Sequence, residues 1–295
     1  MYERKRRTVE EQDKIDFYYT DLATGDVLKN KKELERIHKL HIPPAYKNVM
    51  ISKEENAKVL AYGYDSKGRK QMIYHPSFIE KQQKQKYERL YEVLTCVPAL
   101  LKKLKLDSKR PEYDKACICA LATTLIILCN FRVGSKKYEK ENGSTGVTTL
   151  QCRHVQLVKV PRAPYLCARF CFIGKRGVEN VGICKSKSFC MYVANQKEKK
   201  TDNDYLFTYG GANKEGNIHL HADDVNMYLK EVVPGMNLTS KDLRTWKANA
   251  TFAKTVTDGI PAKKAIKIVA EEMHHTPAVC KQSYLDPSLV VVKDL

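Results

Sequence analysis

The sequence has 295 residues, of which 43% are hydrophobic, and it carries a formal net charge of +18. This length predicts one large or two ordinary domains. The positive charge indicates an anionic partner, with nucleic acid first and a basic ribosomal or membrane-surface protein as the alternative.

The cysteines and the apolar runs argue against disulfides and membrane spans. The ten cysteines form no Cys-x-x-Cys pair and mostly lie in apolar runs, which favours buried free thiols over disulfides or a zinc site. The longest apolar run, residues 116–129, is short for a membrane span and suits a buried helix. Residues 1–14 contain no secretory signal, and we expect the basic residues 4–7 to form a solvated arm rather than a nuclear signal. We therefore expect a soluble, intracellular protein.

Residues 1–78 are expected to form a small β-rich domain. Strands at 16–20 and 25–28 flank a turn, and residues 31–40 predict a short helix that ends before Ile42-Pro43-Pro44. Strands at 59–64 and 70–74 flank Asp65-Ser66-Lys67-Gly68-Arg69, which predicts a hairpin. Cations beside aromatic and amide side chains suit a DNA groove, although an ordinary charged hairpin tip is the alternative. The candidate DNA-binding residues of the hairpin are Lys67, Arg69, Lys70, Gln71 and Tyr74.

Residues 79–295 are expected to form a larger, mainly helical domain, which makes the fold class α+β. Residues 77–91 form a lysine- and glutamine-rich linker with helical spacing. Pro111 is expected in the first turn of a helix that runs to about Phe131, with Gly134 as its stop. Predicted strands at 147–157, 165–173 and 178–184 would form a small antiparallel sheet, with a tight turn at 174–177. Helices follow at 223–232, 240–256 and 261–274, and Thr276 would cap a short helix that ends near Tyr284.

Several residues of this second part could together cleave a phosphodiester without a metal. Such cleavage needs an in-line nucleophile, stabilisation of the nonbridging oxygens and a proton donor for the leaving oxygen. Tyr284 is a candidate nucleophile, and the doublet His274-His275 leaves the choice of histidine open. Arg244 is the one arginine after Arg176, and a guanidinium can hold two phosphate oxygens at once. Walker, GxGxxG and HExxH motifs are absent, so ATP, dinucleotide and zinc-protease functions have no support.

In their order along the chain, these motifs resemble the poxvirus-type DNA topoisomerase IB family, which includes bacterial and giant-virus relatives. The matching pieces are Ile42-Pro43-Pro44-Ala45-Tyr46, Asp65-Ser66-Lys67-Gly68-Arg69-Lys70-Gln71, Phe131-Arg132-Val133-Gly134 with Tyr138, Gly174-Lys175, Lys241-Asp242-Leu243-Arg244-Thr245, and His275-Thr276-Pro277 with Tyr284. They span residues 42–284, nearly the whole chain. The resemblance implies a catalytic domain of the tyrosine recombinase and topoisomerase IB fold.

The resemblance also implies roles for these residues. Tyr284 would form a 3′-phosphotyrosyl bond and leave a free 5′-hydroxyl, after which the cut strand rotates and is resealed without ATP, an essential metal or another cofactor. The implied catalytic set is Arg132, Lys175, Arg244, His275 and Tyr284, with Lys241 and Asn249 in secondary roles and Tyr138 added to the DNA-binding residues. Lys175 would be the general acid. His275 is favoured over His274 because the family's histidine directly precedes Thr-Pro.

The expected partner is duplex DNA, clamped by a monomer, in a virion, a viral factory, a nucleoid or a nucleus. Met72 stands where poxvirus members have an aromatic residue, and Arg176 stands where they have an acidic one, so the poxvirus preference for CCCTT sites is left open. A tyrosine recombinase is the closest alternative, although recombinases place a histidine where this chain has Lys241. A DNA-binding protein that has lost catalysis is the other alternative.

Overall fold

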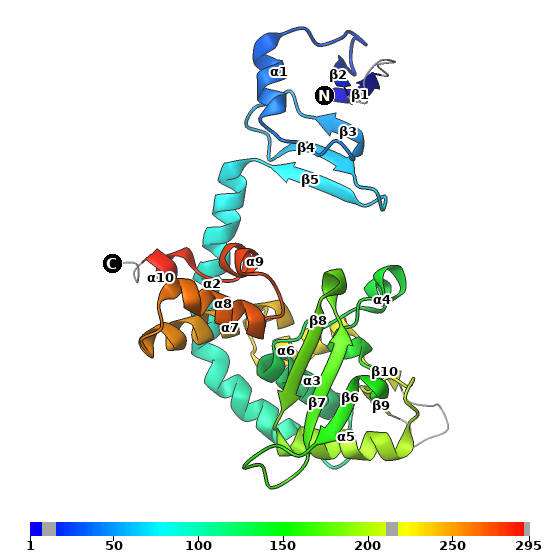
Figure 1. Cartoon of the computed structure of the whole chain (residues 1–295), viewed down its shortest axis with the longest axis vertical. Coiled ribbons are helices and arrows are strands. Elements are labelled where there is room, and N and C mark those ends of the chain that lie inside the picture. Colours follow the sequence, from blue (N-terminus) through cyan, green and yellow to red (C-terminus); the bar gives the residue numbers. More distant parts are fainter. Residues whose placement is uncertain (8–15, 211–217, 292–295) are drawn as a thin grey trace. The chain divides into compact units, whose positions relative to one another are not determined.

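The computed structural model describes residues 1–7, 16–210 and 218–291, and it divides into two compact units, Met1–Tyr87 and Glu88–Leu295 (Figure 1). Helix α2 (Pro76–Asp107) begins in the first unit and continues into the second. The boundary at 78/79 that the sequence predicts lies in the first turn of this helix and stays a prediction. Among the described residues, no helix is long and apolar enough to cross a membrane.

The first unit is a five-stranded antiparallel sheet with the order β2-β1-β3-β4-β5 and one short helix. The strands are β1 (Tyr2–Arg7), β2 (Asp16–Asp21), β3 (Lys47–Ile51), β4 (Val59–Tyr64) and β5 (Lys70–Tyr74), and the helix is α1 (Lys31–His38). Asn30 caps α1 by accepting hydrogen bonds from the amides of Lys32 and Glu33. Ile37 of α1 packs with Val49, Ile51 and Ala61 in the core of this unit.

The basic stretch near the N-terminus is a strand and not a solvated arm. Arg4 is 9% exposed, and its guanidinium donates hydrogen bonds to the carbonyl oxygens of Ile42, Pro43 and Tyr46 at 3.3, 3.1 and 2.6 Å. The prediction of a strand at 25–28 is also wrong, because the pairing there is a single isolated bridge between Val27 and Thr20. Strands β1 and β3 were not predicted, since β1 is mainly polar and the apolar residues of β3, Val49-Met50-Ile51, do not alternate with polar ones.

The second unit is mainly helical, as the sequence predicts. Its helices after α2 are α3 (Lys115–Cys129), α4 (Lys136–Asn142), α5 (Lys187–Lys199), α6 (Ala222–Val232), α7 (Ser240–Thr257), α8 (Ala262–Glu272), α9 (Pro277–Ser283) and α10 (Pro287–Val291). Helix α3 is apolar on every side and eleven of its residues are buried, so it forms the centre of the unit. It contacts α6, α7 and β8.

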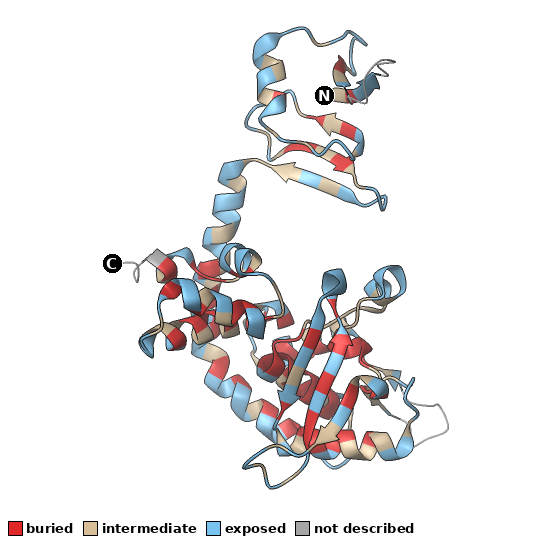
Figure 2. Cartoon of the chain, viewed as in Figure 1, coloured by how far each residue is buried: buried red, intermediate tan, exposed pale blue. Residues whose placement is uncertain are grey.

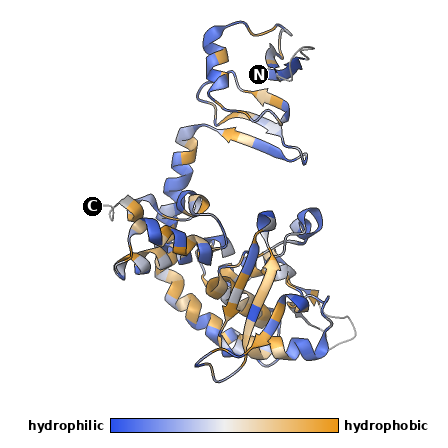
Figure 3. Cartoon of the chain, in the orientation of Figure 1, coloured by the Kyte–Doolittle hydropathy of each residue, from blue (hydrophilic) through white to orange (hydrophobic). Residues whose placement is uncertain are grey.

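A small antiparallel sheet in the order β6-β7-β8 covers this centre. Its strands are β6 (Val155–Val158), β7 (Cys167–Ile173) and β8 (Glu179–Cys184), and a further two-stranded pair joins β9 (Thr208–Tyr209) to β10 (Ile218–His219). Buried and exposed residues alternate along β7, which appears as red and blue stripes in Figure 2. In Figure 3, which colours each residue by its hydropathy, the strands of this sheet carry many of the orange, hydrophobic residues. The α+β fold class predicted from the sequence is therefore confirmed.

Three details of the second unit differ from the sequence-based expectations. Helix α3 begins at Lys115, where the Asp114 side chain accepts a hydrogen bond from the Cys117 amide, so Pro111 precedes the helix. It ends at Cys129 and not near Phe131, because Asn130 adopts a left-handed conformation with φ 54°. Residues 147–154 contain two 3₁₀ turns, Val147–Thr149 and Cys152–His154, so of the strand predicted at 147–157 only the part from Val155 onward forms a strand, β6.

All ten cysteines are free thiols, and Cys96 and Cys171 are the two that are not buried.

Candidate active site

Arg244 lies at the centre of the candidate site, on the buried side of α7. It is 5% exposed, and its Nε and Nη2 donate hydrogen bonds to the carbonyl oxygens of Asn130 at 3.0 Å and Met273 at 3.1 Å. Its third nitrogen, Nη1, donates to the Oη of Tyr284 at 2.8 Å. Burial lowers the pKa of Arg244 from 12.5 to about 10, which still leaves it charged at neutral pH. One guanidinium therefore connects the ends of α3 and α8 to Tyr284.

Tyr284 is held by its backbone as well as by its hydroxyl. It is the residue that ends α9, and its amide donates to the Cys280 carbonyl at 3.0 Å. Asn249, on α7, is 4% exposed and donates from Nδ2 to the carbonyl oxygens of Tyr284 and Thr245, both at 2.8 Å. The Oδ1 of Asn249 accepts from the amide of Asp286 at 2.8 Å. Asn249 therefore fixes the backbone on both sides of Leu285 and positions Tyr284.

His275 stacks on Tyr284, with ring centroids 4.7 Å apart and planes at 22°. Both of its ring nitrogens are buried, and within the described part of the chain neither makes a hydrogen bond of good geometry. Burial, with the nearby charges of Arg244 and Arg132, lowers the pKa of His275 to about 4, against a smaller opposing effect of the Thr276 backbone. His275 is therefore neutral at physiological pH, with ring nitrogens that are available to a ligand.

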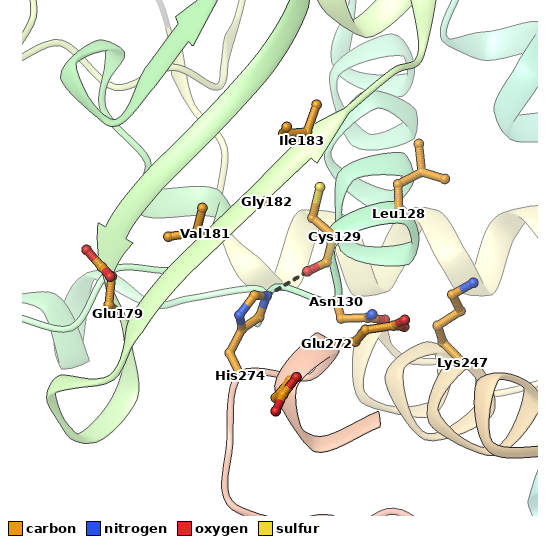
Figure 4. A pocket seen from close by; sticks show the side chains of 11 residues that line it. Leu128, Cys129, Asn130, Glu179, Val181, Gly182, Ile183, Lys247, Glu272 and His274 are labelled. Atoms are coloured by element: carbon orange, nitrogen blue, oxygen red, sulfur yellow. Dashed lines mark hydrogen bonds between the residues drawn. The ribbon is translucent and has the colours of Figure 1, made fainter. Parts of the chain in front are cut away.

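His274 has a different environment from its neighbour. Its backbone is left-handed with φ 55°, and its Nε2 donates to the carbonyl oxygen of Cys129 at 2.9 Å (Figure 4). Its ring packs on Phe131, with centroids 5.2 Å apart. Figure 4 shows the open pocket that His274 lines together with Cys129, Asn130, Lys247 and Glu272. Arg244, His275 and Tyr284 do not line this pocket, which adjoins the candidate site at Asn130, the residue whose carbonyl oxygen accepts from Arg244.

Arg132 follows α3 by three residues, immediately after buried Phe131. Burial is the main cause that lowers the pKa of His275 and of Arg244, and the charge of Arg132 adds to both effects. No hydrogen bond or ion pair involves its side chain within residues 1–7, 16–210 and 218–291. The carbonyl oxygen of Arg132 accepts from the Val147 amide at 2.8 Å, so its backbone is fixed while its guanidinium is available.

Lys175 and Lys241 are not joined to this cluster. Lys175 lies exposed in the turn η3 (Lys175–Gly177) at the end of the β7–β8 hairpin, where Arg176 has φ 63° and Gly177 has φ 74°. Lys241 is exposed in the first turn of α7, one helical turn before Arg244. In the part of the chain that the structure describes, no hydrogen bond, ion pair or ring contact connects either ammonium to Tyr284.

The candidate DNA-binding residues of the β4–β5 hairpin are organised by Asp65. Its carboxylate accepts from Arg69 Nε at 2.8 Å and from Gln71 Nε2 at 3.0 Å, and these hydrogen bonds help to lower the pKa of Asp65 to about 2. The ammonium of Lys70 lies 3.9 Å from the ring centroid of Tyr62. Lys67 is exposed at the turn. The hairpin predicted from the sequence is present, and it presents several cations on one short loop.

The remaining DNA-binding candidates are Tyr74 and Tyr138. Tyr74 donates from Oη to the Met72 sulfur at 3.1 Å, and its ring centroid is 5.2 Å from that of Phe78. Tyr138, on α4 of the other unit, is 60% exposed. Helix α4 was not predicted from the sequence, since its seven residues are polar.

The backbone acceptors that hold Arg244 were not predicted from the sequence. Asn130 is 4% exposed and ends α3, and its carbonyl oxygen receives the Nε of Arg244. An asparagine directly after a long apolar run could have indicated that the helix ends at this residue, because asparagine tolerates the left-handed conformation that ends a helix.

This arrangement can stabilise an anion next to a tyrosine hydroxyl. Arg132 and Arg244 supply positive charge, neutral His275 supplies a ring N–H, and Tyr284 supplies the oxygen that could attack. Among the described residues, no group of three or more His, Cys, Asp or Glu side chains could hold a metal ion.

The comparisons with known proteins identify the family of the chain. Residues 75–286 match the family described as eukaryotic DNA topoisomerase I, catalytic core, and residues 16–65 match the bacterial DNA topoisomerase IB N-terminal domain. DNA topoisomerase 1B of Acanthamoeba polyphaga mimivirus is 32% identical over 292 residues, which cover 92% of this chain and 82% of the relative. DNA topoisomerase I of Monkeypox virus is 25% identical and DNA topoisomerase 1B of Vaccinia virus (strain Copenhagen) is 24% identical, each over 82% of this chain and 74% of the relative.

The family match extends through both units, and it covers Arg132, Lys175, Arg244, His275 and Tyr284 within residues 75–286. The resemblance read from the motifs is confirmed, and it favours a topoisomerase over the recombinase alternative. This chain belongs to the type IB DNA topoisomerase family.

Proposed function

We propose that this protein cuts one strand of duplex DNA with Tyr284, lets that strand rotate to release supercoils, and then reseals it. The observation that carries the proposal is the hydrogen bond from buried Arg244 to the Oη of Tyr284, at 2.8 Å, in a chain of this family. It places a fixed positive charge at the oxygen that must become the nucleophile.

In the cutting step, the Oη of Tyr284 forms a bond to the scissile phosphorus and the bond from phosphorus to the 5′ oxygen breaks. The phenol proton leaves to water, and the leaving 5′ oxygen takes a proton from Lys175. The product is a 3′-phosphotyrosyl link and a free 5′-hydroxyl. Resealing is the reverse step, so the energy of the phosphodiester is kept and no ATP is needed.

The remaining cluster stabilises the charge of the transition state. Arg132 has no protein partner for its side chain in the described residues, and neutral His275 has two ring nitrogens without a good hydrogen bond, so both can turn to the phosphate. Buried polar atoms of this kind require an explanation, and a nonbridging phosphate oxygen supplies one. Electrostatic stabilisation by one such donor contributes about 3–4 kcal/mol.

Lys175 would reach the leaving oxygen only once DNA is bound. Its turn is exposed, and the end of β7 just before the turn is tied to the loop after Arg132, since the Thr145 amide donates to the Ile173 carbonyl at 2.9 Å. Lys241 is close enough along α7 to contact a phosphate next to the one that Arg244 holds, and Asn249 keeps Tyr284 in place.

We infer that a monomer holds the duplex by its phosphates. The net charge of +18 and the cations of the β4–β5 hairpin, Lys67, Arg69 and Lys70, support binding through phosphates. Gln71, Tyr74 and Tyr138 are the residues that would face bases or sugars. The protein would act inside cells or virus factories wherever its DNA lies.

Covalent trapping tests the proposal. The protein is incubated with a duplex labelled on one strand at either its 3′ or its 5′ end, denatured with detergent and separated by size. A 3′-phosphotyrosyl bond transfers the label to the protein only from the strand part on the 5′ side of the cut, so the 5′-labelled duplex alone gives a labelled adduct. Label transfer from the 3′-end label would assign the opposite polarity and overturn the proposal.

A further inference from the structure

Helix α4 is the centre of a loop whose two ends meet directly behind Arg132. The carbonyl oxygens of Arg132 and Val133 accept hydrogen bonds from the amides of Val147 and Thr148, at 2.8 and 2.7 Å. Gly134 and Gly146 lie against each other here, because a Cβ on Gly146 would come within 2.4 Å of the Cα of Gly134. The loop therefore leaves and re-enters the fold at one closed base.

Away from this base, α4 is fastened by Tyr205. The Oη of Tyr205 donates a 2.8 Å hydrogen bond to the Glu139 carboxylate, and the ammonium of Lys136 lies 5.2 Å from the centroid of the Tyr205 ring. Burial and Glu139 raise the pKa of Tyr205 to about 12, so its hydroxyl keeps the proton that it donates. Lys136 and Glu139 are three residues apart, so one side of α4 faces Tyr205.

Tyr205 itself is rigidly mounted. Its carbonyl oxygen accepts from Lys200 Nζ at 2.8 Å, and it forms an isolated bridge with Gln151. The ring of His219 packs on the ring of Tyr205, with centroids 4.1 Å apart. Burial lowers the pKa of His219 to about 4, so the ring that packs on Tyr205 is uncharged at neutral pH.

We propose that Tyr205 is a positioning residue for DNA recognition, which holds α4 through Glu139 and Lys136 so that Tyr138 and Lys137 face the duplex beside the scissile phosphate. Tyr138 is 60% exposed and Lys137 is exposed, whereas Lys136 and Glu139 are half-buried against Tyr205. Helix α4 begins four residues after Arg132, so its first residue lies within about 14 Å of Arg132. The inference rests on the proposed function, because it takes Arg132 to be at the scissile phosphate.

The variants Tyr205→Phe and Glu139→Gln test this positioning role. Phenylalanine keeps the ring that contacts His219 and Lys136 and removes only the hydroxyl, so the variant should fold. Glu141→Gln is the matched control, since Glu141 lies on the same helix, is exposed and has only a 4.0 Å ion pair with Lys137. The double variant Tyr205→Phe with Glu139→Gln measures whether the two side chains act together.

The readout is the distribution of covalent adducts along a long end-labelled duplex of mixed sequence. We expect each single variant to change the relative use of strong and weak cleavage sites on the order of 10-fold, the size of one hydrogen bond to a charged group. The double variant should change the relative use of cleavage sites no more than either single variant does. Glu141→Gln should give the same distribution of sites as the wild type. A decrease in adduct formation that is equal at every cleavage site would mean that Tyr205 serves only stability, and it would overturn the proposal. An unchanged distribution of adducts would overturn it as well.

A second measurement separates this inference from the proposed function. Duplex binding is measured for the same variants in a Tyr284→Phe background, where no adduct can form. Weaker binding for Tyr205→Phe and Glu139→Gln, with Glu141→Gln unchanged, would support the role of Tyr205 even if the wild type formed no adduct. If all three variants bound the duplex as tightly as the Tyr284→Phe parent, the proposed role of Tyr205 would be overturned.

Discussion

The Nη1 of Arg244 donates a 2.8 Å hydrogen bond to the Oη of Tyr284, across 40 residues of sequence. The same guanidinium is fixed by two backbone carbonyl oxygens at the ends of α3 and α8. Since Arg244 cannot turn away without losing these bonds, the proposed nucleophile and its cation are arranged before DNA arrives. Such preorganisation is what makes electrostatic stabilisation effective in a transition state.

Replacement of Arg244 by lysine should reduce the rate of adduct formation by about 10²–10³-fold, because one ammonium cannot replace three fixed donors. We expect the free energy of unfolding to fall by about 1–3 kcal/mol as well, since the carbonyl oxygens of Asn130 and Met273 cannot both keep a partner. Single-turnover cleavage and urea unfolding measure the two effects. The control Lys247→Arg, on the same helix, should change neither. A lysine variant with normal cleavage would remove Arg244 from the site.

Asn249→Ala should destabilise the segment that carries Tyr284. The substitution leaves the Tyr284 carbonyl and the Asp286 amide without their partner, at a cost of about 1–3 kcal/mol. We expect weaker adduct formation with nearly unchanged DNA affinity, because Asn249 is buried and positions Tyr284 without facing DNA. Lys254→Ala, an exposed change on the same helix, should shift the unfolding free energy by less than about 0.5 kcal/mol. An alanine variant as stable and active as the wild type would show that other contacts hold Tyr284.

The free energy of unfolding should fall as the pH decreases from about 6.5 toward 4. His275 has a pKa of about 4 in the folded protein against an ordinary value near 6.5, so in this window the unfolded chain binds a proton that the folded protein does not. Above pH 6.5 both states are neutral and this contribution is constant. His275→Gln should flatten the slope of unfolding free energy against pH between 7 and 5. The same slope in both proteins would mean that His275 is not buried as described.

Affinity for duplex DNA should fall steeply with salt, because phosphate contacts release counterions. With six phosphate contacts, the dissociation constant would rise on the order of 10³-fold between 50 and 200 mM salt. A titration by fluorescence anisotropy at several salt concentrations gives the slope. Replacing Lys67 by alanine should reduce this slope by about one, and a curve that does not respond to salt would contradict binding through phosphates.

The helices and strands that have a strong local sequence pattern were mostly predicted from the sequence. Helix α3 is a long apolar run, the β4–β5 hairpin has Gly68 in its turn, and α9 begins with Thr276-Pro277, so these elements were found with small errors at their ends. Helix α4 and strand β1 were missed because their residues are mainly polar and their order depends on tertiary contacts, such as Tyr205 with Glu139 and Arg4 with the Tyr46 carbonyl.

For the candidate site, motifs identified the residues but not their arrangement. The chemistry of the doublet could not separate His274 from His275, and only the fold places the first on the Cys129 carbonyl and the second against Tyr284. The backbone acceptors of Arg244 carry no side-chain signature at all. How Lys175 joins the site remains a prediction, because its position relative to the reaction depends on DNA.

We propose that Tyr284 cuts and reseals DNA. This activity is tested most directly by relaxation of supercoiled plasmid in EDTA without ATP, comparing the wild type with Tyr284→Phe, which keeps the ring that stacks on His275 and lacks only the hydroxyl. We predict that the wild type relaxes the plasmid and that the variant binds DNA but leaves it supercoiled. A wild type that binds without relaxing the plasmid, or a phenylalanine variant that still relaxes it, would contradict this account.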